Sequence, residues 1–149
     1  MRIVIGSDHA GFRLKEQLKK YLVSLGHDFV DVGTASEMSC DYPDFAKLVA
    51  QRVSSGEFER GVLACGTGIG MCIAANKVNG VRAALVHDPV TARLAWEHNQ
   101  ANVLCLGSRL LAAEYACELV MVWLNAQFEE RHRRRVDKVF ALESFREGK

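Results

Sequence analysis

The chain has 149 residues, a formal net charge of +1 at pH 7, 49% hydrophobic residues and 25% charged residues. This length predicts one domain with a substantial core, and the composition is that of an ordinary globular protein rather than a disordered, collagen-like or coiled-coil chain. A nearly neutral chain has no overall electrostatic attraction to nucleic acid or to anionic lipid. We therefore expect a single domain over residues 1–149.

The N-terminal run lacks the pattern of a secretory signal, and charged residues interrupt every long apolar segment. We therefore expect neither secretion nor a membrane span. The five cysteines are an odd number and form no C-x-x-C pair, which favours a reduced cytoplasmic chain over a disulfide scaffold or a structural zinc site. Apart from Cys65, they are expected to be small core residues, namely Cys40, Cys72, Cys105 and Cys117.

Short β-branched or apolar runs alternate with longer segments of helical periodicity along the whole chain. Strands are expected near residues 3–5, 29–32, 62–65, 81–86 and 102–106. Helices are expected near residues 12–25, from Pro43 onward, and near 69–77, 89–97, 112–126 and 131–147. Because parallel neighbours need crossover connections, this alternation predicts an α/β fold, a Rossmann-like three-layer domain with a five-stranded parallel sheet and an extra C-terminal helix.

Local signals mark several of these boundaries. Gly26 is placed to end the first helix, and Asp88 followed by Pro89 is typical of a helix start. The final helix, 131–147, carries a few apolar residues on an otherwise charged surface. We expect it to pack on another subunit, because one domain would leave much of it exposed.

The turn after the third strand is rich in glycine and follows Cys65, reading Gly66-Thr67-Gly68-Ile69-Gly70. In open α/β sheets, ligands bind beyond the carboxyl ends of the strands. Alternating glycines leave backbone N–H groups uncovered at the start of a helix, which suits a phosphate or an oxyanion. The order of glycines matches neither the dinucleotide fingerprint nor the P-loop.

Cys65 is the residue of this turn with the most reactive side chain. A thiol beside free amides at a helix start should hold more thiolate near neutral pH, which makes Cys65 a candidate base or nucleophile. The alternative is a buried cysteine at a strand end. Thr67 could either cap the helix or orient and relay protons on a bound substrate.

Polar residues follow the first two strands as well. Asp8 and His9 come after the first strand and would face the glycine loop if the first and third strands were neighbours. Alternatively, Asp8 is a helix cap and His9 a surface residue. Tyr42 could line the same pocket, although capping by Asp41 explains most of that segment.

His98 and Asn99 precede the fifth strand and should therefore lie at the amino end of the sheet, opposite Cys65. If His98 is catalytic, it must reach the site of a neighbouring subunit, which predicts a homodimer with shared sites; otherwise it is a surface histidine. Arg109 follows the fifth strand, where a guanidinium suits a phosphate or a salt bridge at a helix start.

Arg131 and Arg135 lie one helical turn apart and could grip one anionic group together. Runs of charge are more often solvated surfaces. No aromatic residues are interleaved to stack nucleobases, so a nucleic-acid site is not expected. No cluster of His, Cys and carboxylate has the spacing of a metal site either.

Several motifs, in this order and spacing, resemble the type B ribose-5-phosphate isomerases over essentially the whole chain. They are Gly6-x-Asp8-His9-Ala10-Gly11, Asp41-Tyr42-Pro43, Cys65-Gly66-Thr67-Gly68-Ile69-Gly70, Ala74-Ala75-Asn76-Lys77, His98-Asn99-x-x-Asn102 and Arg131-His132-x-x-Arg135. The resemblance implies a dimer or tetramer that interconverts ribose 5-phosphate and ribulose 5-phosphate in the pentose phosphate pathway, without metal or cofactor. Galactose-6-phosphate and allose-6-phosphate isomerases resemble the same superfamily, so the sugar length stays open, as does noncatalytic phosphosugar binding.

The resemblance also implies a role for each matching residue. Cys65 would move a proton between C1 and C2 with help from Thr67, and the amides of the glycine loop would stabilise the enediolate. His98 would open the furanose ring with help from Asp8 or His9. Asn99 would bind sugar oxygens, and Arg109, Arg131 and Arg135 would hold the phosphate.

Two positions separate this chain from other members of the resembled group. Some members use a glutamate one turn into the following helix instead of the cysteine, and Met71 stands there in this sequence, which implies the cysteine-dependent version. The segment 128–131 lacks the glycines often found there, so Glu129 or Glu130 could pair with Arg131. Arg133 and Arg134 are expected to face solvent.

Overall fold

The computed structural model describes residues 1–146 and contains one five-stranded sheet in which every pairing is parallel. The strands are β1 (Arg2–Ser7), β2 (Asp28–Asp31), β3 (Arg60–Cys65), β4 (Ala83–Leu85) and β5 (Val103–Gly107), and they lie in the order β2-β1-β3-β5-β4. The predicted α/β class is confirmed, and the predicted strand near 81–86 is shorter than expected.

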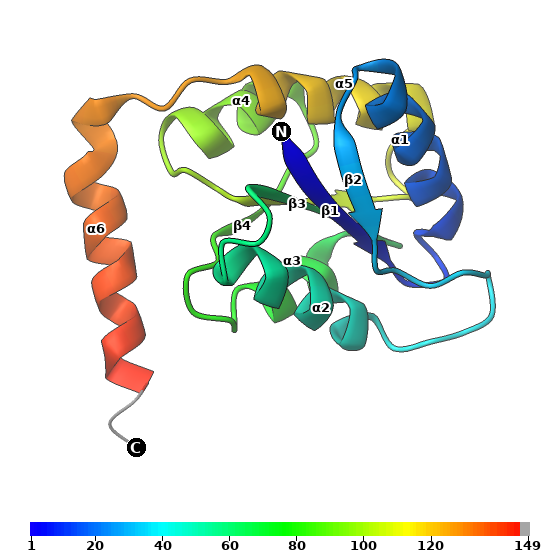
Figure 1. Ribbon diagram of the computed structural model, residues 1–149, viewed down its shortest axis with the longest axis horizontal. Coiled ribbons are helices and arrows are strands. Elements are labelled where there is room, and N and C mark those ends of the chain that lie inside the picture. The colour runs from blue at the N-terminus through cyan, green and yellow to red at the C-terminus, as the bar shows by residue number, and fades with distance from the viewer. Residues whose placement is uncertain (147–149) are drawn as a thin grey trace.

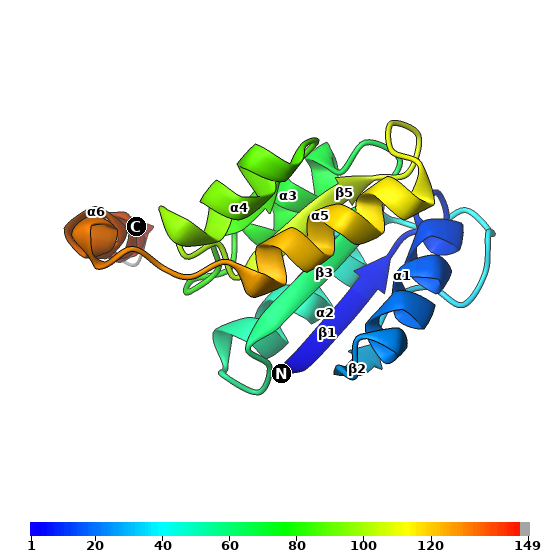
Figure 2. The same cartoon turned by 90° about the horizontal axis from the view of Figure 1, so that it is seen from above.

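Helices cover both faces of this sheet, as Figure 1 and the view from above in Figure 2 show. They are α1 (Phe12–Ser24), α2 (Tyr42–Ser54), α3 (Ile69–Ala75), α4 (Pro89–Glu97), α5 (Ala113–Asn125) and α6 (Arg133–Ala141). Helices α1, α4 and α5 bury one hydrophobic cluster against the sheet, and α2 and α3 bury a second on the other face. The predicted three layers are confirmed.

Helix boundaries follow the sequence signals at most positions. The Asp88 side chain accepts a hydrogen bond from the Thr91 amide at 2.9 Å, and Gly26 follows α1 with a φ of +73°. Asp41 occupies the N-cap position of α2 ahead of Pro43, as predicted, but its side chain makes no capping hydrogen bond.

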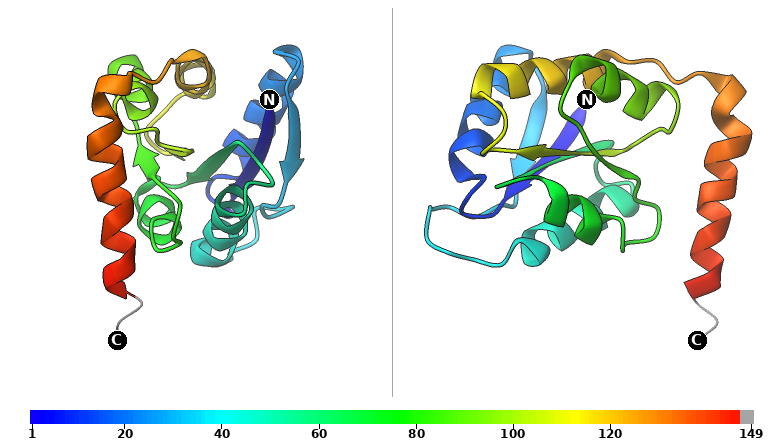
Figure 3. Two further views of the ribbon diagram at one scale, coloured as in Figure 1. Left: turned by 60° about the vertical axis from the view of Figure 1, so that its left-hand side comes forward. Right: turned by 180° about the vertical axis from the view of Figure 1, so that it is seen from behind.

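The C-terminal segment is divided where the sequence predicted one helix over 131–147. A 3₁₀ turn (Glu130–His132) precedes α6, and a second 3₁₀ stretch (Leu142–Arg146) follows it, while residue 147 lies outside the described residues. Figure 3 shows α6 standing beside the layers at the end of an extended connection. Val136 is buried against the domain, but Val139 and Leu142 are 50% and 62% exposed.

The cysteines are less uniform than predicted. Cys65 and Cys105 are buried, whereas Cys40, Cys72 and Cys117 are half-buried. A hydrogen bond with the Cys105 thiol, opposed by burial, lowers the pKa of Cys72 to about 7. Cys72 is therefore more acidic than an ordinary core cysteine. Within the described residues, no helix combines the length and apolarity needed to cross a bilayer.

Candidate active site

The order of strands reverses between β1 and β3, which are neighbours as the sequence analysis supposed. From β1 the chain continues to β2 on one side, and from β3 it continues toward the opposite half of the sheet. A crevice at the carboxyl ends of two such strands is the usual ligand site of an open α/β sheet. We name the turns after β1, β3 and β5 (residues 8–11, 65–70 and 107–109) the carboxyl-end region.

Backbone contacts hold the first two of these turns together. The Asp8 amide donates to the Ala64 carbonyl at 3.3 Å, and Asp8 Oδ1 accepts from the Gly11 amide at 3.0 Å. A Cβ at Gly11 would lie only 2.2 Å from the Ala64 oxygen, so a side chain there would push the turns apart. Asp8 is buried and closes the turn that leads into α1, whose N-cap residue is Gly11 rather than Asp8.

His9 is oriented by a segment that the sequence analysis did not link to it. His9 Nδ1 lies 3.2 Å from both the amide nitrogen and the carbonyl oxygen of Cys40, so the backbone of Cys40 orients the ring. Lys15 fixes the same loop, because its Nζ donates to the Thr34 carbonyl at 2.8 Å and to Asp31 Oδ2 at 2.6 Å. No local pattern marks Lys15, since it occupies an ordinary helical position.

The glycine loop surrounds the Cys65 sulfur with main-chain groups. The Gly68 amide donates to Cys65 Sγ at 3.1 Å, so a main-chain donor fixes the position of the sulfur inside the loop. Gly68 has a φ of +78°, which side chains rarely adopt, and a Cβ there would lie 2.5 Å from Leu85 Cδ1. Thr67 Oγ1 accepts a hydrogen bond from the Ile69 amide at 3.3 Å, although Gly68, not Thr67, is the N-cap residue of α3.

Tyr42 and Arg109 lie against this loop. A Cβ at Gly70 would be 2.7 Å from Tyr42 Cζ, and one at Gly66 would be 2.9 Å from Arg109 Nη1. Arg109 comes this close because β5, not β4, is the neighbour of β3. The Arg109 amide donates to the Gly66 carbonyl at 3.0 Å, so the loop and the turn after β5 are joined as well.

The structure places His98 and Asn99 at the amino end of the sheet, as predicted. His98 follows α4, and the five residues of β5 separate this end from Arg109, a length of about 16 Å. The His98 ring stacks on His132 with ring centroids 4.2 Å apart. Its Nε2 lies 4.0 Å from Glu129 Oε1. We name residues 98–100 and 129–135 the amino-end region.

The predicted arginines of the last helix belong to this second region. Arg131 is paired with Glu129 at 2.5 Å, as the altered segment 128–131 suggested. Arg135 Nη1 donates to His132 Nδ1 at 2.9 Å. His132 is only 8% exposed. It is part of the motif Arg131-His132-x-x-Arg135, but the sequence predicted no role for it, because no neighbouring residue indicates its burial.

Arg133 and Arg134 were both expected to face solvent. Arg133 is exposed, and its side chain also donates to Glu130 and, at 3.0 Å, to Gln100 Oε1, while its guanidinium stacks on Phe128. Arg134 is exposed, as predicted.

A possible metal cluster arises only through the fold. His98, Glu129 and His132 offer ligand atoms within 4.8 Å of one another. Burial and the neighbouring Arg131, His98 and Arg135 lower the pKa of His132, which keeps its ring neutral. Because Arg135 donates to Nδ1, the ring proton is on Nε2, which then has no lone pair for a cation. The arginines also repel cations, so the amino-end region is better suited to an anion.

The model of the ribose/galactose isomerase family matches residues 3–139. The chain belongs to the ribose/galactose isomerase family. It is 44% identical to ribose-5-phosphate isomerase B of Escherichia coli over 97% of this chain and 98% of that protein. It also resembles the solved structure of Clostridium thermocellum ribose-5-phosphate isomerase B, with a TM-score of 0.94 and 46% identity over 97% of this chain and 98% of the other.

A further solved relative is ribose-5-phosphate isomerase B of Mycoplasma genitalium with bound ribulose-5-phosphate. Its TM-score is 0.92 and its identity 44%, covering 96% of each chain. The family resemblance stated from the motifs is therefore confirmed, and it extends over both regions of this chain.

Proposed function

We propose that this chain interconverts D-ribose 5-phosphate and D-ribulose 5-phosphate as an aldose-ketose isomerase of the pentose phosphate pathway. The observation that carries the proposal is the position of the Cys65 sulfur. This atom accepts a hydrogen bond from the Gly68 amide, inside the loop that joins all three turns of the carboxyl-end region. A base held by main-chain donors suits proton transfer next to a carbonyl group. The relatives named above support the pentose phosphate as substrate.

The chemical step needs one base and a set of donors. The Cys65 thiolate removes the proton from C2 of the open-chain aldose, and the electron pair moves to the carbonyl oxygen to form an enediolate. Loop amides from Gly66, Ile69 and Gly70 stabilise this oxyanion while the Gly68 amide holds the sulfur, and Thr67 assists proton movement between O1 and O2. The Cys65 thiol then returns the proton to C1 and regenerates the thiolate.

Ring opening and phosphate binding need the amino-end region of a second copy of the chain. His98 of that copy opens the furanose ring with help from Asp8 or His9, and Asn99 binds sugar oxygens. Arg109, Arg131 and Arg135 hold the phosphate, and Tyr42 lines the pocket. The exposed Val139 and Leu142 of the C-terminal segment support its packing on a partner in a homodimer, or in a tetramer built from dimers.

The proposal requires no metal or cofactor, because each proton transfer is assigned to a side chain. A cytoplasmic location suits the reduced cysteines and the sugar phosphate substrate. No nucleic-acid or membrane partner is part of the proposal.

The test is formation of ribulose 5-phosphate from ribose 5-phosphate with EDTA present, comparing the wild type with a folded Cys65→Ala variant. We expect EDTA-insensitive turnover that falls at least about a hundredfold in the variant. Full activity of the variant would require a different base. Preference for allose or galactose 6-phosphate would move the assignment to a hexose, and saturable binding without turnover would indicate a noncatalytic phosphosugar-binding protein.

A further inference from the structure

Glu129 occupies a central position in the amino-end region. Its backbone amide donates to the Glu97 carbonyl at 2.9 Å, which fixes the Glu129 backbone beside the end of α4. Its carboxylate is half-buried, with 37% of the side chain exposed. The main chain therefore directs this carboxylate toward the histidines and arginines proposed to meet the substrate.

The Glu129 carboxylate faces basic side chains from two segments of the chain. Arg131 Nε and Nη2 both contact its Oε2 at 2.5 Å. His132 Nε2 lies 3.7 Å from the same oxygen, and His98 Nε2 lies 4.0 Å from the other. The hydrogen bond from Arg131 lowers the pKa of Glu129, so the carboxylate is ionised at neutral pH.

The neighbouring Glu130 lies in a different environment. It pairs with Arg133 at 3.0 Å, and its side chain is 75% exposed. Although the two glutamates are adjacent in the sequence, only Glu129 contacts Arg131. Glu130 is therefore a matched control for the charge of this segment.

The contacts of Glu129 are those that an incoming phosphate would need. A guanidinium binds carboxylate and phosphate with the same fork of N–H groups, so Arg131 Nε and Nη2 cannot serve both at once. His132 Nε2 is buried and has no hydrogen-bond partner, because 3.7 Å to Glu129 is too long. Arg135 holds the opposite nitrogen and so keeps this N–H available for another acceptor.

We propose that Glu129 is an internal competitor of the substrate, a carboxylate that occupies Arg131 until the phosphate of the sugar displaces it. The inference rests on the proposed function, in which Arg131 binds that phosphate. Glu129 thereby lowers the affinity of the site for small anions, and it keeps Arg131 folded against His98 and His132 when no substrate is bound. Phosphate binding then frees Glu129 to turn toward solvent.

The test uses the full chain and measures the Kd for inorganic phosphate by calorimetry and the KM for ribose 5-phosphate. We expect Glu129→Gln to lower both values about two- to fivefold, the range of a partly exposed ion pair, and Glu130→Gln to leave both unchanged. In an Arg131→Gln background, the further change Glu129→Gln should have no effect on the Kd, because the guanidinium for which Glu129 and phosphate compete is absent.

Three results would overturn the inference. They are a raised or unchanged Kd in Glu129→Gln, an equal decrease in Glu130→Gln, and a decrease that persists without Arg131. Glu129→Ala provides a second variant if the glutamine chain folds poorly, and it should shift the Kd in the same direction. The phosphate measurement is independent of turnover, so absence of isomerase activity in the wild type would count against the proposed function alone.

Discussion

The two functional regions of this molecule are built in different ways. The carboxyl-end region is joined by main-chain hydrogen bonds and by close approaches such as that of Gly11 to Ala64. The amino-end region is joined by charged side chains, and its Arg131 and Glu130 side chains are 66% and 75% exposed. Main-chain donors stay in place while charge develops in a reaction, whereas exposed ion pairs exchange partners easily. This difference supports the proposal that the first region provides the base for proton abstraction, and that the second provides His98 for ring opening and Arg131 and Arg135 for the phosphate.

The largest expected effect is on catalysis, and it distinguishes the two regions by the reaction step that each one serves. Ribulose 5-phosphate cannot close a furanose ring, because its O5 carries the phosphate, so exchange of its C1 proton with solvent needs only the base. We expect Cys65→Ser to lose this exchange by about 10²- to 10⁴-fold. His98→Asn should retain the exchange and lose turnover of cyclic ribose 5-phosphate. Proton NMR in deuterated water measures the exchange, and equal loss in both variants would remove the distinction.

The second expected effect is recovery of activity in mixed dimers, and it tests whether the two regions meet across subunits. Cys65→Ala and His98→Asn proteins are each expected to be nearly inactive on ribose 5-phosphate. After subunit exchange at equal amounts, half of the dimers are mixed and each has one intact site, so about a quarter of the wild-type activity should return. The assay is turnover after verified mixing by native mass spectrometry. Absence of recovered activity in such dimers would contradict the shared site.

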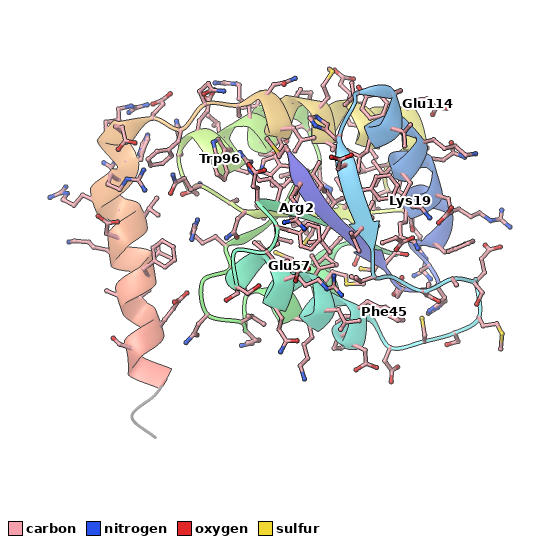
Figure 4. The ribbon with its side chains drawn as sticks, in the orientation of Figure 1. Arg2, Lys19, Phe45, Glu57, Trp96 and Glu114 are labelled. Atoms are coloured by element: carbon pink, nitrogen blue, oxygen red, sulfur yellow. The ribbon has the colours of Figure 1, made fainter. Side chains whose placement is uncertain are left out.

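The smallest expected effect is on stability and concerns the buried ion pair between Asp31 and Lys15. Asp31 Oδ2 lies 2.6 Å from Lys15 Nζ and 2.9 Å from the Nζ of Lys19, which is labelled in Figure 4. Burial opposes ionisation of Asp31, but hydrogen bonds from Lys15, Lys19 and the Gly33 amide outweigh it, so the pKa of Asp31 is lowered. Asp31→Asn should lower the free energy of unfolding at pH 7 by about 2 kcal/mol, because it leaves the Lys15 charge buried.

The pH dependence of this effect has a definite sign. Since the folded-state pKa of Asp31 is depressed, its contribution is fully present above the ordinary aspartate pKa of about 4 and is lost as the pH falls through the lowered value. The difference between wild type and Asp31→Asn should therefore shrink at pH 3. Urea unfolding at both pH values measures it, with Asp28→Asn at the exposed start of β2 as the control. A constant difference would show that the ion pair does not titrate as described.

Much of the fold and of the site could be predicted because its signals are local. Hydrophobic periodicity predicted the strands and helices, and Asp88 and Gly26 marked their boundaries. The place of Cys65 before the glycine loop and of His98 before β5 follows from chain order alone. The contacts of single side chains were harder to predict. Asp41 occupies the N-cap position of α2 without making the capping hydrogen bond, and the exposed Arg133 pairs with Gln100 from a distant part of the chain.

The sequence by itself determined the α/β class, the glycine loop beside a thiol and the placement of His98 opposite that thiol. Only the tertiary structure decided that β5 lies between β3 and β4, which brings Arg109 to the loop. It also decided that Glu129 meets His98 and that Lys15 supports the loop at Thr34. The physical reason is that periodicity and capping act over a few residues, whereas strand order and charge clusters depend on which distant surfaces pack best together.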